Sequence, residues 1–506
     1  MVIKGFRRVI TVTKGLLFRP FLTILLKHDY LAGMRRLQRT GPLFLTIIST
    51  IAISACATIG GGSNLAEAGD EQRLPEAPVI SLDQPLELHE ILYVSELGRT
   101  LHTVSAEGGD HELLLDWQGY DGFARGIITS HAWSSDGDAI AASVHLRTDE
   151  GRRLEVLYIG KEGSKEMRPV FSSPEVSPFY LYWNPESPEI SFIGGDGSGA
   201  LYLYVADTET GETTLAHRGT SSMYWSWTAD GRSLITNSGG NLREGLGTLR
   251  IHERREEGFE PTVLTREERS AGRFQVPDVA GNDRIAVAVR NEYGSNTLAV
   301  FDQEGTLLRR VADFQGVGSL SWSPSGRYLA YVEGNRRYGG GIIGTLKVVD
   351  TDRVDRVVSG PRLAVPAGMA TEVQHTKVQR ESQSPPSLVL SYMWSPDSRS
   401  ILYYEPRYIQ QGGELEILME ASLLDAETGN LETLGSFRPA PEFLSRVLPF
   451  YDQYARSSTF WSPDGRRIVF NGLNDADNQA IFIIDLDDRE AGAMEIAEGV
   501  VPLWRP

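Results

Sequence analysis

Residue types that carry out chemistry are spread thinly along this chain of 506 residues. The nine histidines are scattered, and none forms a His-x-His or His-Glu-x-x-His pair with the spacing of metal ligands. The stretch Gly-Asp-Gly-Ser-Gly at 195–199 has the wrong spacing for a Gly-x-Ser-x-Gly nucleophile elbow and predicts a hairpin turn. Asp-rich stretches at 474–478 and 485–488 lack the Gly and terminal Glu of a calcium loop, and they too are typical of turns. We therefore predict no catalytic residues, no metal and no cofactor, although a site assembled across distant segments would escape this test.

Aromatic side chains are concentrated just before several tryptophans, in the segments 178–183, 223–227 and 448–456. Aromatic rings can stack on sugars or grip a peptide, and neighbouring charged or amide groups can add directional hydrogen bonds. The candidate binding residues are Phe179, Tyr180, Tyr182, Tyr224, Trp225, Phe450, Tyr451, Asp452, Tyr454 and Arg456. The alternative is that these aromatics only pack between neighbouring sheets, which is what we expect of the recurring tryptophans themselves.

The amino-terminal 55 residues differ from the rest of the chain, with nine basic residues and one acidic residue. They include an apolar run at 42–55, which is short for a bilayer span but typical of a secretory signal. The run ends in Ile53-Ser54-Ala55-Cys56, which resembles a bacterial lipobox, and Cys56 is the only cysteine of the chain. The resemblance implies that the Cys56 thiol is lipidated and anchors the protein to a membrane.

These features divide the chain into four regions. Starting at Met34 would give the signal a compact basic region, so residues 1–33 are either upstream translation or a cytoplasmic basic segment. Residues 34–55 are then the lipoprotein signal peptide. Residues 56–88 are the lipidated cysteine and a flexible tether rich in Gly, Ala, Glu and Pro. Residues 89–506 form the folded domain.

The charge of the predicted mature chain is strongly acidic. Without residues 1–55 it keeps 40 basic and 66 acidic side chains, a net charge near −26. Such a surface argues against nucleic acid and against an anionic membrane face as partners. A single cysteine excludes an intramolecular disulfide, and we expect a monomer.

The folded domain repeats one short pattern, seen most clearly at Trp461-Ser462-Pro463-Asp464-Gly465. Pro presets φ and Gly closes the turn, so the pattern with its alternating flanks predicts a β-hairpin. Copies begin at Trp133, Trp183, Trp227, Trp322 and Trp394, and a degenerate copy lies at 276–284. A second hairpin follows in most units, for example at 203–211. Four strands in a repeat of roughly 45 residues are typical of a β-propeller blade.

We therefore predict an all-β fold, a single propeller of four-stranded blades. The first unit, from residue 91, lacks its first strand. Residues 501–506 resemble the first strand of a unit that stops at its turn. Pairing the carboxy-terminal strand with the amino-terminal blade would close the ring and remove exposed sheet edges. This count gives eight blades, or seven if the degenerate unit does not form one.

The repeated hairpin resembles the TolB-type, WD-repeat-like propeller family over residues 89–506. The chain departs from TolB itself in having more units and no separate amino-terminal α/β domain. The resemblance implies that the strand before each turn is innermost, so that the aromatic segments enter beside the channel on the usual binding face.

Fold does not fix function, but the pattern favours a non-enzymatic envelope lipoprotein outside the cytoplasmic membrane that binds a protein or peptide at the channel face. Two alternatives remain: a propeller enzyme acting on a glycan or peptide, and a solute-sensing accessory subunit.

Overall fold

The computed structural model describes residues 76–506 with internal gaps. The gaps are 96, 118–121, 196–198, 220–222, 240–246, 257, 265–268, 271–275, 291–295, 315–318, 339–340, 354–356, 360–386, 390, 412–413, 449–450 and 452–455. Four of the candidate residues, Cys56, Phe450, Asp452 and Tyr454, therefore lie outside the described residues.

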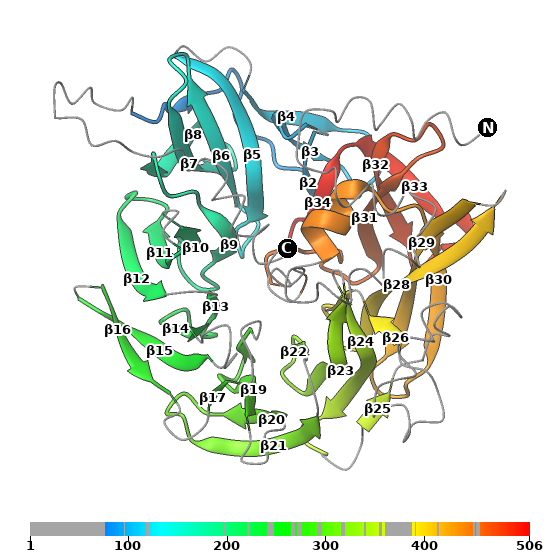
Figure 1. Ribbon diagram of the computed structural model, residues 1–506. Coiled ribbons are helices and arrows are strands. Elements are labelled where there is room, and N and C mark those ends of the chain that lie inside the picture. Colours follow the sequence, from blue (N-terminus) through cyan, green and yellow to red (C-terminus); the bar gives the residue numbers. More distant parts are fainter. Residues whose placement is uncertain are drawn as a thin grey trace.

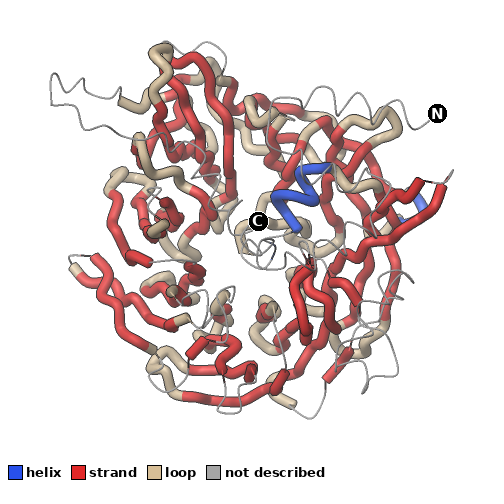
Figure 2. The backbone as a smooth tube through the Cα atoms, in the orientation of Figure 1, coloured by secondary structure: helices blue, strands red, loops and turns tan. Residues whose placement is uncertain are grey.

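Eight antiparallel sheets surround a common axis, each with one strand near the axis and the others stacked outward (Figure 1, Figure 2). We number the blades in chain order and give their strands from the inside outward.

Blade 1 consists of β34 (Val500–Trp504), β2 (Ile91–Val94), β3 (Thr100–Val104) and β4 (His111–Asp116). Blade 2 consists of β5 (Phe123–Trp133), β6 (Ala139–Thr148), β7 (Arg153–Lys161) and β8 (Glu166–Ser173), with β1 (Ile80–Ser81) outside β8. Blade 3 consists of β9 (Phe179–Trp183), β10 (Glu189–Gly195), β11 (Leu201–Asp207) and β12 (Thr213–Gly219). Blade 4 consists of β13 (Met223–Trp227), β14 (Ser233–Ser238), β15 (Thr248–Arg255) and β16 (Gly258–Val263).

In blade 5, both β17 (Arg269–Ser270) and β18 (Asp278–Val279) pair with β19 (Ile285–Arg290), which is followed by β20 (Asn296–Phe301) and β21 (Leu307–Phe314). Blade 6 consists of β22 (Leu320–Trp322), β23 (Tyr328–Tyr338), β24 (Gly341–Asp350) and β25 (Val357–Ser359), and β26 (Ser387–Val389) also pairs with β24. Blade 7 consists of β27 (Ser391–Trp394), β28 (Ser400–Gln411), β29 (Glu414–Asp425) and β30 (Leu431–Phe437).

Blade 8 consists of β31 (Arg467–Leu473), β32 (Gln479–Asp485) and β33 (Ala493–Glu498). Its innermost position is a single bridge between Trp461 and Ile468. Two short helices, η2 (Phe443–Val447) and η4 (Arg489–Ala491), lie in its connections. The degenerate unit at 276–284 thus forms a blade, so the predicted count of eight is confirmed and the alternative of seven is wrong.

The Ser-Pro-Asp-Gly turn is stabilised by its own side chains. The Ser462 hydroxyl donates to Asp464 Oδ1 at 2.6 Å and accepts from the backbone N–H of Arg467 at 2.9 Å. Gly465 has φ of +71°, a left-handed conformation that glycine adopts without strain. The same serine–aspartate bond recurs in the copies at 134 and 395, so these three turns are stabilised by the same local hydrogen bond.

The recurring tryptophans join neighbouring blades, as predicted. The indole N–H of Trp133 donates to the carbonyl oxygen of Leu503, one residue before Trp504 of the preceding blade, at 3.1 Å. The N–H groups of Trp227 and Trp394 make the equivalent bonds at 3.3 Å, to the residues that precede Trp183 and Trp322. The hydrophobic core likewise lies between blades, with clusters that mix side chains of adjacent sheets.

The ring closes as the sequence predicts. In blade 1, β34 pairs antiparallel with β2, placing Trp504 opposite Ile91 and Leu503 opposite Leu92. The N–H of Arg505 then donates to the Glu90 carbonyl at 2.7 Å. One blade therefore contains strands from both ends of the described chain.

The packed domain begins before residue 89, within the range expected to be tether. β1 pairs with the outer strand of blade 2, with Ile80 opposite Met167. Ile80, Leu86 and Leu88 are buried in the core between blades 1 and 2. In the part of the chain that the structure describes, no helix is long and apolar enough to cross a bilayer.

Candidate functional site

We call the end of the ring at which the innermost strands begin the mouth end, and the end that carries the Trp-Ser-Pro-Asp-Gly turns the turn end. The register of blade 3 places Phe179 beside Ile193 at the mouth end and Trp183 beside Ile190 near the turn end. The candidate aromatic residues on β9 and β13 therefore lie on innermost strands, which is the position that the family resemblance implied.

The described parts of the connection from blade 7 to blade 8 are residues 438–448, 451 and 456–459. Its helix η2 lies inside the ring, coloured orange in Figure 1. From η2, Arg446 donates to the carbonyl oxygen of Thr129 in blade 2 at 2.5 Å. Farther along, Arg456 donates to Asp278 and to the Val279 carbonyl in blade 5. The described part of this connection thus contacts blades on different sides of the axis.

A charged group inside the ring joins three segments that are far apart in sequence. Arg456 forms an ion pair with Asp278, and the Tyr182 hydroxyl interacts with Arg456. The Asp278 carboxylate is buried and also accepts the N–H of Trp322 at 2.5 Å, whereas the Arg456 side chain is 37% exposed. Burial opposes the charge of Arg456, but the Asp278 carboxylate outweighs it and the pKa of Arg456 is raised. Burial is also the main reason that the pKa of Tyr182 is raised.

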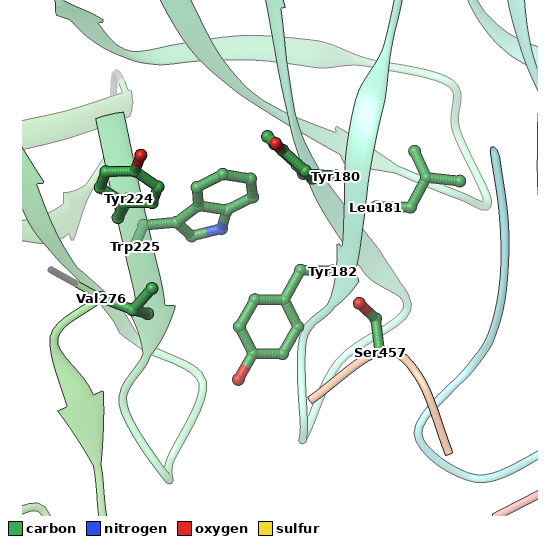
Figure 3. A pocket seen from close by; sticks show the side chains of 7 residues that line it. All are labelled: Tyr180, Leu181, Tyr182, Tyr224, Trp225, Val276 and Ser457. Atoms are coloured by element: carbon green, nitrogen blue, oxygen red, sulfur yellow. The ribbon is translucent and has the colours of Figure 1, made fainter. Parts of the chain in front are cut away.

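Figure 3 shows a small hollow whose lining includes Tyr182 and Ser457, the residue that follows Arg456. Its lining residues are Tyr180, Leu181, Tyr182, Tyr224, Trp225, Val276 and Ser457. Its free volume of about 10 Å³ has room for about one water molecule. The hollow is therefore a contact point between aromatic side chains and not an enclosed substrate pocket.

The structure brings only some of the predicted binding residues together. Tyr180, Tyr182, Tyr224 and Trp225 line the hollow, and the ring of Phe179 lies 5.0 Å from that of Tyr180. Their binding role stays a prediction. Arg456 lies at the adjacent ion pair, whereas Tyr451 is buried elsewhere, with its ring 5.4 Å from Tyr392 in the core between blades 6 and 7.

Within the hollow, exposure separates two kinds of aromatic residue. Tyr224 and Trp225 are buried, and the Trp225 indole N–H donates to Ser191 Oγ at 2.8 Å in the neighbouring blade. Tyr180 and Tyr182 are only half-buried. Tyr180 and Tyr182 are thus the accessible aromatic residues of the hollow, whereas Trp225 holds blade 4 against blade 3.

Tyr180 has an unusual backbone conformation for an aromatic residue, with φ of +55°. The register between β9 and β10 shifts at this point, because Ser191 faces Tyr182 while Ile193 faces Phe179. A residue other than glycine in the left-handed region carries strain, which folded proteins keep where the surrounding structure imposes it. The bulge turns the Tyr180 side chain toward the hollow (Figure 3).

Sequence reasoning missed Asp278 at this site and a second hollow at the turn end. Asp278 lies in the degenerate unit, and a carboxylate at an innermost-strand position, where other units have uncharged residues such as Tyr182, Ser226 and Ser321, was the available signal. A larger hollow of about 570 Å³ lies at the turn end beside blade 4, lined by charged residues that include Asp230, Arg232 and Glu253. Among the described residues, no three His, Cys, Asp or Glu side chains are grouped so that they could hold a metal ion.

Comparison with known proteins adds little beyond the fold. Neither protein-family models nor curated proteins match the chain. A TolB structure from Acinetobacter baumannii is 20% identical, with 52% of this chain and 62% of that chain covered and a TM-score of 0.32. The match thus spans less than two thirds of that TolB chain.

Other similar structures are an oligogalacturonate lyase in complex with manganese and the C-terminal WD40 domain of Sif2. The lyase is 12% identical, with 71% of this chain and 84% of that chain covered and a TM-score of 0.43. The WD40 domain is 11% identical, with 79% and 96% covered and a TM-score of 0.44. The predicted TolB-type, WD-repeat-like propeller is therefore confirmed as a fold, which rests on the strand pairing described above, and these likenesses say nothing of activity.

Proposed function

We propose that this protein is a non-enzymatic binding scaffold of the cell envelope that engages a protein or peptide at the mouth end of its propeller. Cys56 would carry the lipid anchor outside the cytoplasmic membrane, and the segment before residue 76 would act as the tether. The acidic composition of the mature chain disfavours nucleic acid as a partner.

The observation that carries the proposal is the position of Tyr180. Its half-buried ring is held by a strained, left-handed backbone next to Tyr182 and the ion pair of Arg456 with Asp278. A tyrosine offers a large apolar face and a hydroxyl with few rotatable bonds, which is why such residues are frequent at the centre of protein interfaces. Strained conformations are concentrated at ligand-contacting positions.

Site-specific photo-crosslinking in the intact envelope tests this proposal. A photoreactive phenylalanine analogue at position 180 should give one defined crosslinked product. The matched control is position 209, an exposed residue in the turn between β11 and β12 at the turn end. Equal products at both positions, or none at position 180, would contradict binding at the mouth end.

Lipidation is tested separately. We expect wild-type protein to incorporate labelled fatty acid and Cys56→Ala to incorporate none and to accumulate as an unprocessed precursor or a soluble form. Equal labelling of the two proteins would show that Cys56 is not the modified residue. Because this test does not involve Tyr180, either part of the proposal can fail alone.

A further inference from the structure

Arg250 on β15 is a half-buried cation without a counter-ion in the described part of the chain. Its guanidinium makes one hydrogen bond there, from Nη1 to the Ser238 hydroxyl at 3.1 Å. A guanidinium has several further N–H donors, arranged in a planar fork that suits two oxygens at once. Most of the donor capacity of Arg250 is therefore unused by the described residues.

Several partly buried arginines of this protein are paired with carboxylates, for example Arg153 with Glu155 and Arg467 with Asp485 at 3.3 Å. Arg284 has no carboxylate partner among the described residues, but it donates to the Thr351 hydroxyl and to the Gly326 carbonyl oxygen. Burying a charge without a partner is costly, so a folded protein seldom keeps one without a use. Burial lowers the pKa of Arg250, and no nearby carboxylate offsets that effect.

The side chains around Arg250 form a compact polar cluster between blades 3 and 4. His217 Nε2 on β12 lies 2.9 Å from Ser238 Oγ on β14, so one hydroxyl joins His217 to Arg250. Behind them, the rings of His217 and His252 are 4.8 Å apart, and His252 Nε2 lies 2.9 Å from Thr236 Oγ1. At pH 7 the positive charge of the cluster is that of Arg250, because burial lowers the pKa of His217 to about 4 and leaves that ring neutral.

Strand register places this cluster near the aromatic hollow. Trp225 on β13 pairs with Thr236 on β14, and Thr236 pairs with Arg250 on β15. Paired residues of adjacent strands point to the same face of a sheet, and strands lie about 4.8 Å apart. Arg250 is therefore on the same face of blade 4 as Trp225, about 10 Å farther from the axis.

We propose that Arg250, Ser238 and His217 form a binding site for an oxyanion, the carboxylate or phosphate group of a ligand, in the seam between blades 3 and 4. The guanidinium of Arg250 would bind two oxygens of the anion, and the hydroxyl of Ser238 and the imidazole of His217 would supply further hydrogen bonds. The site goes beyond the proposed partner binding and needs no partner for its test.

The experiment is a calorimetric titration of the full chain with sodium phosphate and with sodium acetate, with sodium chloride at matched ionic strength as the reference. We expect saturable binding of at least one oxyanion, and a rise in melting temperature that chloride does not reproduce. Binding of phosphate alone would identify a phosphate ligand, and binding of acetate would identify a carboxylate ligand. No saturable binding of either oxyanion would overturn the proposal.

Substitutions test whether the oxyanion binds at this cluster. Arg250→Gln should weaken oxyanion binding by about tenfold or more. The matched control is Arg218→Gln, an exposed arginine on the neighbouring strand β12 that lies over the Tyr202 ring, and its affinity should be unchanged. If Arg250→Gln does not fold, Arg250→Lys and His217→Gln replace it, and each should weaken binding severalfold. Equal losses in the Arg218 and Arg250 variants, or unchanged affinity in all cluster variants, would also overturn it.

Discussion

Single side chains of this protein connect segments that are far apart in the chain. Arg456 and Asp278 are separated by 178 positions, and their ion pair holds the connection before blade 8 against blade 5. Because the Asp278 side chain is only 7% exposed, removing this partner would leave a buried carboxylate without its ion pair. A contact of this kind stabilises the arrangement of whole blades and not only the two residues.

We expect Arg456→Met to lower the free energy of unfolding by about 2 kcal/mol, because it leaves the buried Asp278 carboxylate unpaired. Adding Asp278→Asn to this variant should recover part of the loss, since the neutral amide needs no counter-charge. Chemical denaturation of the two single variants and the double variant would measure the coupling. Strictly additive losses would show that the two side chains do not depend on each other.

A second prediction concerns His131, which is buried and donates from Nε2 to the Val501 carbonyl of the closing strand at 2.9 Å. Burial, helped by the nearby charge of Arg446, lowers the pKa of His131 to about 4, below its ordinary value of 6.5. The unfolded chain therefore binds a proton that the folded protein does not, so this residue makes the protein less stable as the pH falls from 6.5 toward 4.

The comparison of wild type with His131→Gln isolates this effect, because glutamine does not titrate and can donate to the same carbonyl. Between pH 7 and pH 5 the wild type should lose about 2 kcal/mol relative to the variant. Denaturation at several pH values would measure the difference. A constant difference across this range would contradict the assignment of the pH dependence to His131.

At the scale of single elements, the hairpin turns are repeated in sequence but differ in their surroundings. A Cβ added to Gly465 would meet only Pro396 Cδ, at 3.8 Å, whereas a Cβ added to Gly231 would lie 2.1 Å from Asn184 Oδ1. Both glycines have positive φ, so both substitutions carry backbone strain.

Gly465→Ala should therefore cost about 1 kcal/mol of unfolding free energy, from the left-handed conformation alone. Gly231→Ala should cost at least about twice as much, since Asn184 must move and its hydrogen bond to the Gly231 carbonyl, 2.8 Å long, is disturbed. Thermal and chemical denaturation would compare the two. Equal costs would show that the neighbouring blade adapts freely to the extra methyl group.

The elements were predictable from the sequence where their chemistry is local. In the turns at 134, 395 and 462 the serine hydroxyl bonds to the aspartate two residues on, so the hairpins, the blade count and the closing strand could be derived from residue types and spacing. The contacts of the connection before blade 8 could not be predicted, because they depend on hydrogen bonds of Arg446 to blade 2 and of Arg456 to blade 5. The same holds for Tyr451, whose environment is set by packing against Tyr392.

At the scale of the whole molecule, closure of the ring brings residues of different blades into contact with one another. β34 pairs with β2, and its Leu503 and Val501 carbonyls accept bonds from Trp133 and His131 of blade 2. The candidate site is equally collective, since its residues come from blades 3, 4 and 5 and from the connection that precedes blade 8. Sequence could place each aromatic residue on a strand, but distances between strands of different blades are set by the closed ring.

Deleting residues 499–506 should lower the melting temperature by many degrees and broaden the unfolding transition. The deletion exposes the edge of β2 and removes the acceptors of the Trp133 and His131 hydrogen bonds. A synthetic peptide of residues 499–506, added in excess, should restore part of the stability. Wild-type stability in the truncated protein would show that the ring does not depend on this strand.

The docking of β1 on blade 2 also has a mechanical consequence. A pull on the chain ahead of residue 76 is first taken up by the short pairing of Ile80 with Met167 and by the buried side chains of Leu86 and Leu88. These contacts lie outside the pairing of β2 with β34, so tension would peel away the amino-terminal segment while the propeller stayed shut. In the lipid-anchored protein that we propose, the amino-terminal segment would therefore detach before the pairing of β2 with β34 that closes the ring.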